Sequence, residues 1–337
     1  MAGWTLGPFH RADDHNPILG MGDRTFDCPM TKKVVRWESD HVFNPAAVVH
    51  NGHVVILYRA EDDSGSGIGA HTSRLGYAES KDGLTFTKSD HPVLYPADDT
   101  QKAYEWPGGC EDPRLVELPT GGYLLTYTQW NRHTARLAVA TSQDLKVWTK
   151  HGPAFSGRIR DLWSKSGAVV TELVHGRLVA AKIKDRYWMY WGEGNVYLAS
   201  STDGISWEPL LDPKGEPLPL LEPRADHFDS LLAEPGPPAV KTKNGIVLLY
   251  NGRNDPAKGD SRLHGQTYSA GQALFSAEDP SKLLDRTQDY FLTPERPYEK
   301  TGQFSDGTVF IQGLVHFKNR WLLYYGTADS AVAVAHT

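Results

Sequence analysis

Apolar and polar residues alternate along the chain in short runs that are separated by turn-forming residues. Five pairs of these runs are rich in Val, Ile, Leu and Tyr, and each pair encloses a short turn such as Asn-Gly or Gly-Gly. Turns of this kind between β-branched and aromatic runs are a strong short-range signal for a β-hairpin. The pattern therefore predicts five hairpins, over residues 47–58, 115–127, 169–181, 239–250 and 313–325.

A second pattern recurs beside the hairpins. Residues 75–86, 137–148 and 196–207 each contain an alternating strand, the motif Ala-x-Ser-x-Asp and a turn that ends in an aromatic residue. Strand-rich units that repeat about every 60 residues predict an all-β fold, here a five-bladed β-propeller whose active site lies in the central channel. The terminal aromatics are expected to pack between blades; they are Phe86, Trp148 and Trp207.

The repeat also predicts the domain organisation. We expect residues 41–337 to form a single five-bladed propeller, which is the catalytic domain, and residues 1–40 to form an N-terminal segment that packs on it.

Charge and composition exclude several classes of partner. The 337 residues include 35 Lys and Arg and 41 Asp and Glu, spread along the chain, with a net charge of -6. This distribution predicts no basic patch that would bind nucleic acid or an anionic membrane. No apolar run approaches the roughly 18 residues of a membrane span, and no signal peptide is visible. We therefore expect a soluble cytoplasmic protein, or a periplasmic one if a leader has been removed; the sequence indicates no oligomeric state.

Cysteine usage and motif content narrow the chemistry further. Cys28 and Cys110 are the two cysteines, and neither has metal-ligand spacing. We therefore expect no metal site and no cofactor. The nucleophilic-serine, zinc-protease, phosphate-loop and dinucleotide motifs are also missing from the sequence.

Carboxylates are the remaining candidates for chemistry. Three acidic groups occur where blades begin or end, beside Gly or Pro: Glu111-Asp112-Pro113-Arg114, the segment from Asp229 to Glu234, and the pair Asp306 and Asp329. Each acid taken alone is also compatible with a turn or helix cap. Two separated carboxylates are the minimum for glycoside cleavage, because one protonates the leaving oxygen and the other activates water.

Five sequence strings, in order, carry a resemblance to a known family. They are Asn44-Pro45, Tyr58-Arg59-Ala60, Glu111-Asp112-Pro113-Arg114, Gly236-Pro237-Pro238 followed by Leu248 to Gly252, and Tyr324 to Asp329. Together they resemble glycoside hydrolase family 130, which comprises β-mannoside phosphorylases and β-1,2-mannosidases on a five-bladed propeller. The resemblance implies a single displacement with inversion, in which Asp112 donates a proton through a sugar hydroxyl. It also implies mannose contacts from Asn44, Arg59, Glu111 and Asp329.

Departures from the family pattern bear on the attacking group. Phosphorylases gather Lys, Arg and His around a phosphate dianion. Here Lys165 remains, but Asn251 stands where a histidine is expected, and Ala181 to Ile183 replace an expected arginine. Glu234 adds a negative charge that repels phosphate and suits a base for water. We therefore expect an inverting β-mannosidase, with β-1,2-linked mannosides as the expected substrates and Asp112 and Glu234 as catalytic carboxylates whose roles are left open.

The predicted partner is a β-mannoside oligosaccharide. Its predicted binding residues are Asn44, Arg59, Glu111, Arg114, Lys165, Asp229, Asn251, Asp306 and Asp329. Tyr104 and Trp106 are the expected aromatics for stacking on sugar rings. Two alternatives stay open. The first is a phosphorylase that uses inorganic phosphate and releases mannose 1-phosphate, with Arg158, Arg160 and Arg253 forming the phosphate site. The second is a non-catalytic carbohydrate-binding propeller.

Overall fold

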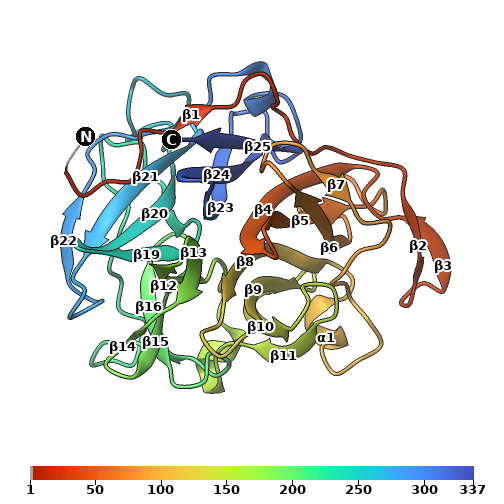
Figure 1. The fold of residues 1–337 in the computed structure, drawn as a ribbon, viewed down its shortest axis with the longest axis horizontal. Helices are drawn as coiled ribbons and strands as arrows, with labels where there is room; N and C mark the ends of the chain where they lie inside the picture. Colours follow the sequence, from red (N-terminus) through yellow and green to blue (C-terminus); the bar gives the residue numbers. More distant parts are fainter. Residues whose placement is uncertain (1–2) are drawn as a thin grey trace.

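The computed structural model describes residues 3–337 and consists almost wholly of β-strands (Figure 1). The helical elements in this range are short: α1 (Lys102–Glu105) and two 3-10 helices, Gly157–Asp161 and Pro297–Glu299. The predicted all-β class is thus confirmed. None of the helices in the described part of the chain is long and apolar enough to cross a membrane.

The first two sheet units are antiparallel meanders in chain order. The first contains β4 (His41–His50), β5 (His53–Glu61), β6 (Ser73–Ser80) and β7 (Thr87–Lys88). The second contains β8 (Gly109–Glu117), β9 (Tyr123–Trp130), β10 (Ala135–Ser142) and β11 (Thr149–Pro153). The repeat seen in the sequence therefore corresponds to one four-stranded meander.

The later units are variants of the same plan. The third contains β12 (Ala168–Val174), β13 (Arg177–Ala180), β14 (Lys182–Ile183), β15 (Arg186–Trp191), β16 (Tyr197–Ser201) and β17 (Glu208–Pro209). The fourth contains β18 (Leu232–Pro235), β19 (Ala239–Thr242), β20 (Gly245–Arg253), β21 (Tyr268–Phe275) and β22 (Leu283–Arg286). The fifth contains β23 (Val309–Phe317), β24 (Arg320–Thr327) and β25 (Ala331–His336).

All five predicted hairpins are confirmed by strand pairing. They join β4 to β5, β8 to β9, β12 to β13, β19 to β20 and β23 to β24. Strands of neighbouring units meet at the middle of the molecule: β4 contacts β8 and β23, and β12 pairs in parallel with β19. Figure 1 shows the units following one another around this centre.

Residues from the N-terminal part of the chain contact the last two units. Strand β1 (His10–Arg11) pairs with β25, so the fifth sheet has the order β1-β25-β24-β23. The backbone of Leu6 exchanges two hydrogen bonds with the side chain of Gln272, at 2.9 and 2.8 Å. Strands β2 (Thr25–Cys28) and β3 (Lys33–Arg36) form a hairpin that projects at the right of Figure 1.

The Ser-x-Asp motifs have a structural role in the turns. In the first unit, the Asp82 carboxylate accepts hydrogen bonds from the Ser80 hydroxyl and from the backbone of Leu84 and Thr85, all at 2.8 Å. Asp144 and Asp203 make the same set of contacts. Side-chain caps of this kind hold a tight turn without regular strand pairing.

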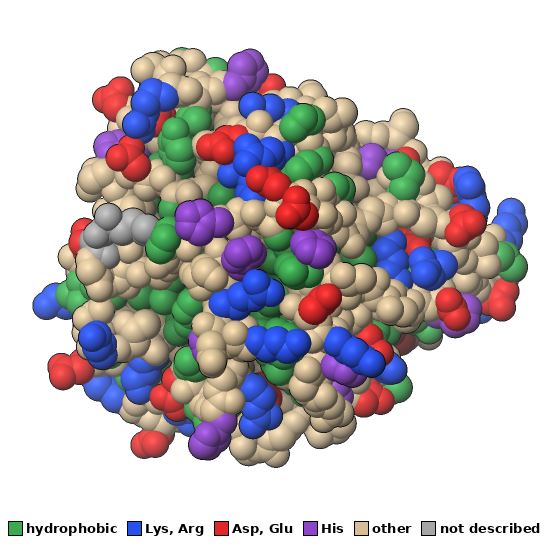
Figure 2. Space-filling model, turned by 45° about the horizontal axis from the view of Figure 1, so that its top comes forward, with side chains coloured by type: hydrophobic (Ala, Val, Ile, Leu, Met, Phe, Trp, Pro, Cys, Tyr) green, Lys and Arg blue, Asp and Glu red, His purple; other side chains and the backbone are tan. Residues whose placement is uncertain are grey.

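The aromatics after these motifs pack against the preceding unit, as predicted. Phe86 of the first unit meets Tyr324 of the fifth edge-on, with ring centroids 5.9 Å apart. Trp148 packs in a cluster with Leu57 of the first unit, and Trp207 packs in one with Leu124 of the second. On the face in Figure 2, acidic and basic side chains are mixed, in keeping with their spread along the sequence.

Irregular backbone at the inner ends of the first strands positions the side chains that face the centre. The pairing register shifts between Phe43 and Pro45 in β4 and between Glu111 and Arg114 in β8. The shifted residues Asn44 and Asp112 have φ of 46° and 47°, and each precedes a proline, which needs no ladder hydrogen bond. A bulge re-aims a side chain relative to its neighbours.

Candidate active site

A cavity of about 340 Å³ lies at the inner ends of the units. Six of the residues predicted from the sequence line it together: Asn44, Arg59, Asp112, Lys165, Glu234 and Asp329. They come from β4, β5, β8, the segment before β12, β18 and the turn between β24 and β25. Segments far apart in the chain therefore contribute to a single polar cavity.

Asp112 lies at the most basic part of the cavity. Its Oδ1 accepts hydrogen bonds from Nδ2 of Asn44 at 2.8 Å and from Arg59 at 3.2 Å, and its Oδ2 is 3.4 Å from Nζ of Lys165. Burial disfavours the charged carboxylate, but the charges of Lys165, Arg59 and Arg114 outweigh burial and lower the pKa of Asp112. Asp112 is therefore ionised at neutral pH in the ligand-free site.

Arg59 connects Asp112 to two further carboxylates. Its NH2 atom is 2.5 Å from Oε1 of Glu61 and 3.0 Å from Oε1 of Glu111, and its guanidinium lies 4.7 Å from the centroid of the Phe43 ring. Burial raises the pKa of Glu111 against the opposing charge of Arg59. Glu111 is not among the lining residues, and its contact to Arg59 orients that arginine.

Glu234 is in the opposite protonation state from Asp112. The Ser166 hydroxyl donates a hydrogen bond to it. Burial and the charge of Glu193 raise the pKa of Glu234 to about 8, although Lys165 and Arg114 oppose this shift. Burial also raises the pKa of Asp329, to about 7. The ligand-free cavity thus favours an ionised Asp112 and a protonated Glu234.

Two residues predicted to bind substrate support the backbone instead of lining the cavity. Arg114 is buried and donates hydrogen bonds to the carbonyls of Pro235 at 2.8 Å, Gly236 at 3.2 Å and Asp112 at 3.1 Å. It thereby fixes the Asp112 bulge against the strand that carries Glu234. Asn251 exchanges two hydrogen bonds with the backbone of Ile311, at 3.1 and 2.8 Å.

Two other predicted carboxylates lie outside the central cavity. Asp229 is fully buried and is bound by Arg224 at 2.8 Å, by Arg286 at 2.7 Å and by the Tyr250 hydroxyl at 2.7 Å. This ion-paired cluster accounts for its burial. Asp306 lines a separate cavity and is half-exposed.

Of the three arginines predicted for a phosphate site, two lie outside the central cavity and one lines it. Arg158 pairs with Glu216 and Arg160 with Asp161 on the exposed surface, and neither lines the cavity. Arg253 does line it, with its guanidinium 5.3 Å from the ring centroid of Tyr268 and 5.2 Å from that of Phe304.

Glu193 and four aromatic residues of the cavity were not identified from the sequence. Glu193 follows β15 in a loop between Gly192 and Gly194, which have φ of 123° and 92°. An acid flanked by two glycines in a tight loop is the signal that could have identified it. The expected stacking residues Tyr104 and Trp106 do not line this cavity, whose aromatic lining comprises Phe43, Tyr268, Phe304 and Phe310.

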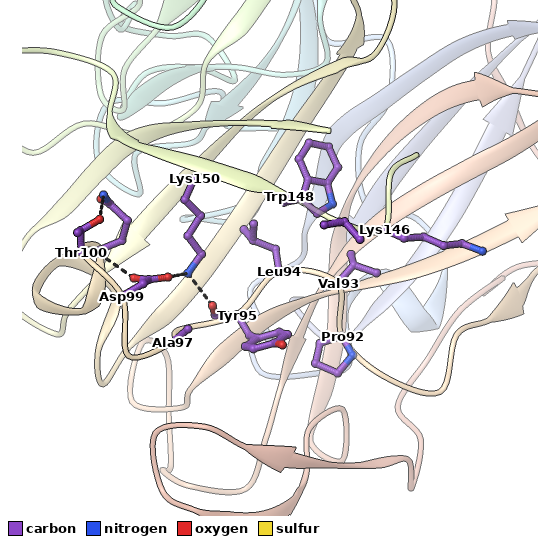
Figure 3. A pocket seen from close by; sticks show the side chains of 12 residues that line it. Pro92, Val93, Leu94, Tyr95, Ala97, Asp99, Thr100, Lys146, Trp148 and Lys150 are labelled. Atoms are coloured by element: carbon purple, nitrogen blue, oxygen red, sulfur yellow. Dashed lines mark hydrogen bonds and ion pairs between the residues drawn. The ribbon is translucent and has the colours of Figure 1, made fainter. Parts of the chain in front are cut away.

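A larger cavity, of about 490 Å³, lies between the first and second units (Figure 3). Its Lys150 binds Glu105 at 2.5 Å, Asp99 at 3.2 Å and the Tyr95 carbonyl at 2.7 Å. Because this lysine is already neutralised by two carboxylates, the central cavity is the better candidate for chemistry.

Comparison with known proteins agrees with the arrangement of these residues. Residues 10–337 match the model of glycoside hydrolase family 130, described as beta-1,4-mannooligosaccharide phosphorylase. The chain belongs to glycoside hydrolase family 130. The resemblance seen in the sequence strings is thus confirmed over nearly the whole chain.

Family 130 relatives of this chain include proteins that are described as phosphorylases and proteins that are described as hydrolases. The 1,2-beta-oligomannan phosphorylase of Thermoanaerobacter sp. (strain X514) is 32% identical over 310 residues, which are 91% of this chain and 93% of that protein. A glycosyl hydrolase structure from Bacteroides ovatus is 51% identical with a TM-score of 0.98, covering 100% of this chain and 95% of that one. A third structure is 52% identical with a TM-score of 0.98 and the same coverage; its description states that the family contains glycoside hydrolases that target beta-1,2 mannosidic linkages in Candida mannan.

Proposed function

We propose that this family 130 protein is an inverting β-mannosidase that cleaves β-1,2-linked mannosides with water. The observation that carries the proposal is the presence of Glu193 and Glu234 together in the cavity, where the charge of one raises the pKa of the other. A phosphate dianion entering beside them would be repelled by their negative charge, whereas a neutral water would not be repelled, and the ionised form of Glu234 is the base that activates this water. The 52% identity to a structure described with β-1,2-specific hydrolases supports the same choice.

The proposal includes the architecture. We infer that the five antiparallel units are the blades of a five-bladed β-propeller formed by residues 41–337, with residues 1–40 packed on it. The five hairpins, the contacts between strands of neighbouring units and the pairing of β1 with β25 support this inference.

Glycone recognition is assigned to the basic part of the cavity. Asn44 uses its amide nitrogen on Asp112, while its Oδ1 is buried and has no hydrogen-bond partner in the described residues. A buried acceptor without a partner is costly, and a sugar hydroxyl would satisfy it. Arg59, Lys165 and Asp329 line the same space and complete the proposed mannose contacts.

Asp112 and Glu234 divide the proton transfers in the proposed reaction. Water attacks the anomeric carbon opposite the leaving oxygen and gives its proton to Glu234, while Asp112 supplies the proton for the leaving oxygen through a sugar hydroxyl. Turnover then ends with Glu234 protonated and Asp112 ionised, which is the state that the ligand-free site favours. One proton must return to Asp112 before the next turnover.

The shared proton predicts a pH dependence. Above the pKa of Glu234, about 8, the pair holds no proton, so kcat/KM should fall as pH rises through this value. Glu193→Gln removes a negative charge that raises this pKa. The alkaline limb of the pH–rate profile, where kcat/KM falls, should therefore move to lower pH. Rates measured across the neutral and alkaline range test this, with Asp229→Asn as the control that leaves the limb in place. A limb that does not move in Glu193→Gln would contradict the assignment.

The direct test of function is phosphate dependence. The protein is incubated with β-1,2-mannobiose with and without inorganic phosphate, and the products are followed by NMR. We expect mannose at the same rate in both reactions, with the α anomer formed first because the configuration inverts. Mannose 1-phosphate, together with no turnover in the absence of phosphate, would overturn the proposal, and binding without any turnover would support a carbohydrate-binding role.

Arg253 is the observation that favours phosphorolysis as the second candidate. It lines the cavity, and its Nε is buried without a hydrogen-bond partner in residues 3–337. An unoccupied guanidinium donor suits a phosphate oxygen. If the protein is a phosphorylase, Arg253→Ala should raise the KM for phosphate, which is measured from the rate at increasing phosphate concentration.

A further inference from the structure

An exposed tryptophan stands beside the cavity. Trp163 is 52% exposed and lies two residues before Lys165, which lines the cavity. Its indole Nε1 donates a hydrogen bond to Glu193, another lining residue. The ring is thus held at the cavity rim by a specific contact.

The rim around Trp163 is built from two further apolar side chains. Trp130 meets Trp163 edge-on, with ring centroids 5.6 Å apart and an interplanar angle of 67°. The Trp130 Nε1 donates a hydrogen bond to the carbonyl of Gly69 at 2.9 Å, and the adjacent Ile68 lines the cavity and is 61% exposed. We call Trp163, Trp130 and Ile68 the Trp rim.

A close approach of the backbone fixes the position of Trp130. A Cβ atom on Gly108 would lie 2.2 Å from Cδ1 of the Trp130 ring, so only glycine leaves room for the ring there. Trp163 therefore packs against the Trp130 ring, which has little room to shift, while about half of the surface of Trp163 stays exposed to solvent. Rigid exposed aromatics beside a polar cavity are typical of surfaces that bind a ligand with an apolar face.

We propose that the Trp rim binds the leaving-side part of a manno-oligosaccharide, with a sugar ring stacked on Trp163. The inference rests on the proposed function and extends it to the part of the substrate beyond the cleaved bond. A cavity of about 340 Å³ is near the lower end of the roughly 300–1,000 Å³ of ligand pockets. A manno-oligosaccharide longer than this cavity extends past its edge, where the Trp rim lies. The C–H face of a hexose then covers the exposed indole.

The hydrogen bond from Trp163 to Glu193 gives this stacking a second consequence. Glu193 lines the same cavity as Glu234 and its charge acts on that residue, and it accepts a hydrogen bond from the indole N–H. A sugar ring on Trp163 restrains that indole and therefore Glu193. Substrates with a leaving-side sugar should react in a better ordered site than substrates without one.

Binding measurements with two substitutions at Trp163 test the proposal. Trp163→Ala removes the ring, whereas Trp163→Phe keeps an aromatic face but loses the Nε1 donor. The binding measurements use an Asp112→Asn background, in which turnover is about a thousandfold slower. There the affinity for β-1,2-mannotriose measured by calorimetry should fall about tenfold or more with Trp163→Ala and about threefold or less with Trp163→Phe. Mannose, which reaches only the cavity, should bind equally well to all three proteins.

A control variant and a comparison of the changes in KM and kcat complete the test. Val147→Ala truncates another exposed apolar residue, which is 73% exposed and lines the cavity between the first two units instead of the central one, and should leave mannotriose affinity unchanged. With the catalytic Asp112 restored, Trp163→Ala should raise KM for mannotriose more than it lowers kcat. Unchanged mannotriose affinity in Trp163→Ala, or an equal loss for mannose, would overturn the proposal. The calorimetry measures binding and not hydrolysis. It would therefore still test whether the Trp rim binds mannotriose even if the protein proved not to be a hydrolase.

Discussion

Replacing Asp112 by asparagine is expected to lower kcat for β-1,2-mannobiose about a thousandfold, in the range of roughly 10²–10⁴ typical for loss of general-acid catalysis. The isosteric amide cannot supply the proton that the leaving sugar oxygen needs. An aryl β-mannoside, whose leaving phenolate needs no proton, should lose much less. Steady-state rates on the two substrates measure this difference.

A matched control separates lost catalysis from lost folding. Asp229 is also a buried carboxylate between two arginines, Arg224 and Arg286, but it lies outside the cavity. Asp229→Asn should lower stability by as much as about 3–5 kcal/mol, because it leaves two partly buried arginines without their buried partner, while kcat stays near the native value. If Asp112→Asn retains activity on mannobiose within tenfold, Asp112 is not the proton source.

Replacing Glu234 by glutamine is the second change with a large expected effect. The amide cannot take a proton from water, so hydrolysis should again fall about a thousandfold. Unlike Asp112→Asn, this variant should recover turnover when azide is added. Azide needs no base, and the cavity has lost a negative charge that repels anions. The product should be the α-mannosyl azide, since the displacement inverts the β configuration.

The two variants therefore have opposite signatures. Asp112→Asn should respond to a better leaving group and not to azide, and Glu234→Gln should respond to azide and less to the leaving group. Product analysis by NMR and rates on both substrates distinguish them. Azide rescue of Asp112→Asn instead would reverse the assignment of the two carboxylates.

Local patterns were sufficient to predict much of the fold. The five hairpins follow from alternation and turn residues, which act over a few positions, and the strand pairing confirms them. The aromatics after the Ser-x-Asp motifs also lie where the repeat predicts. The extra strand β14 and the pairing of β12 with both β13 and β15 were not predictable, because they depend on how one unit accommodates its neighbours.

The site residues show where sequence reasoning reaches its limit. Asn44 and Asp112 each precede a proline, and that local signal placed both in the cavity. Asp229 also lies at the beginning of a unit, yet Arg286, 57 residues later in the chain, binds it elsewhere. Position within a repeat predicts which end of a sheet a residue occupies. It does not predict which distant cation will neutralise that residue.

Glu193 illustrates the opposite case. Its loop has no catalytic motif, and its relevance arises from its contact with Trp163 and its charge acting on Glu234. These are contacts between segments about 30 and 41 residues from Glu193 along the chain (163 to 193 and 193 to 234). No pattern of residue types within one segment contains that information.

The pairing of β1 with β25 has a consequence for synthesis in the cell. His10 and His336 are partners in one sheet, although 326 residues separate them along the chain (10 to 336). A ribosome adds residues in order, so the fifth sheet acquires its full set of strands only after nearly everything else has emerged. Until then the β1 segment has no strand to pair with, and β4 lacks its neighbour β23. Nascent chains stalled before β23 should therefore expose unpaired strand edges and recruit chaperones, whereas chains released after β25 should not.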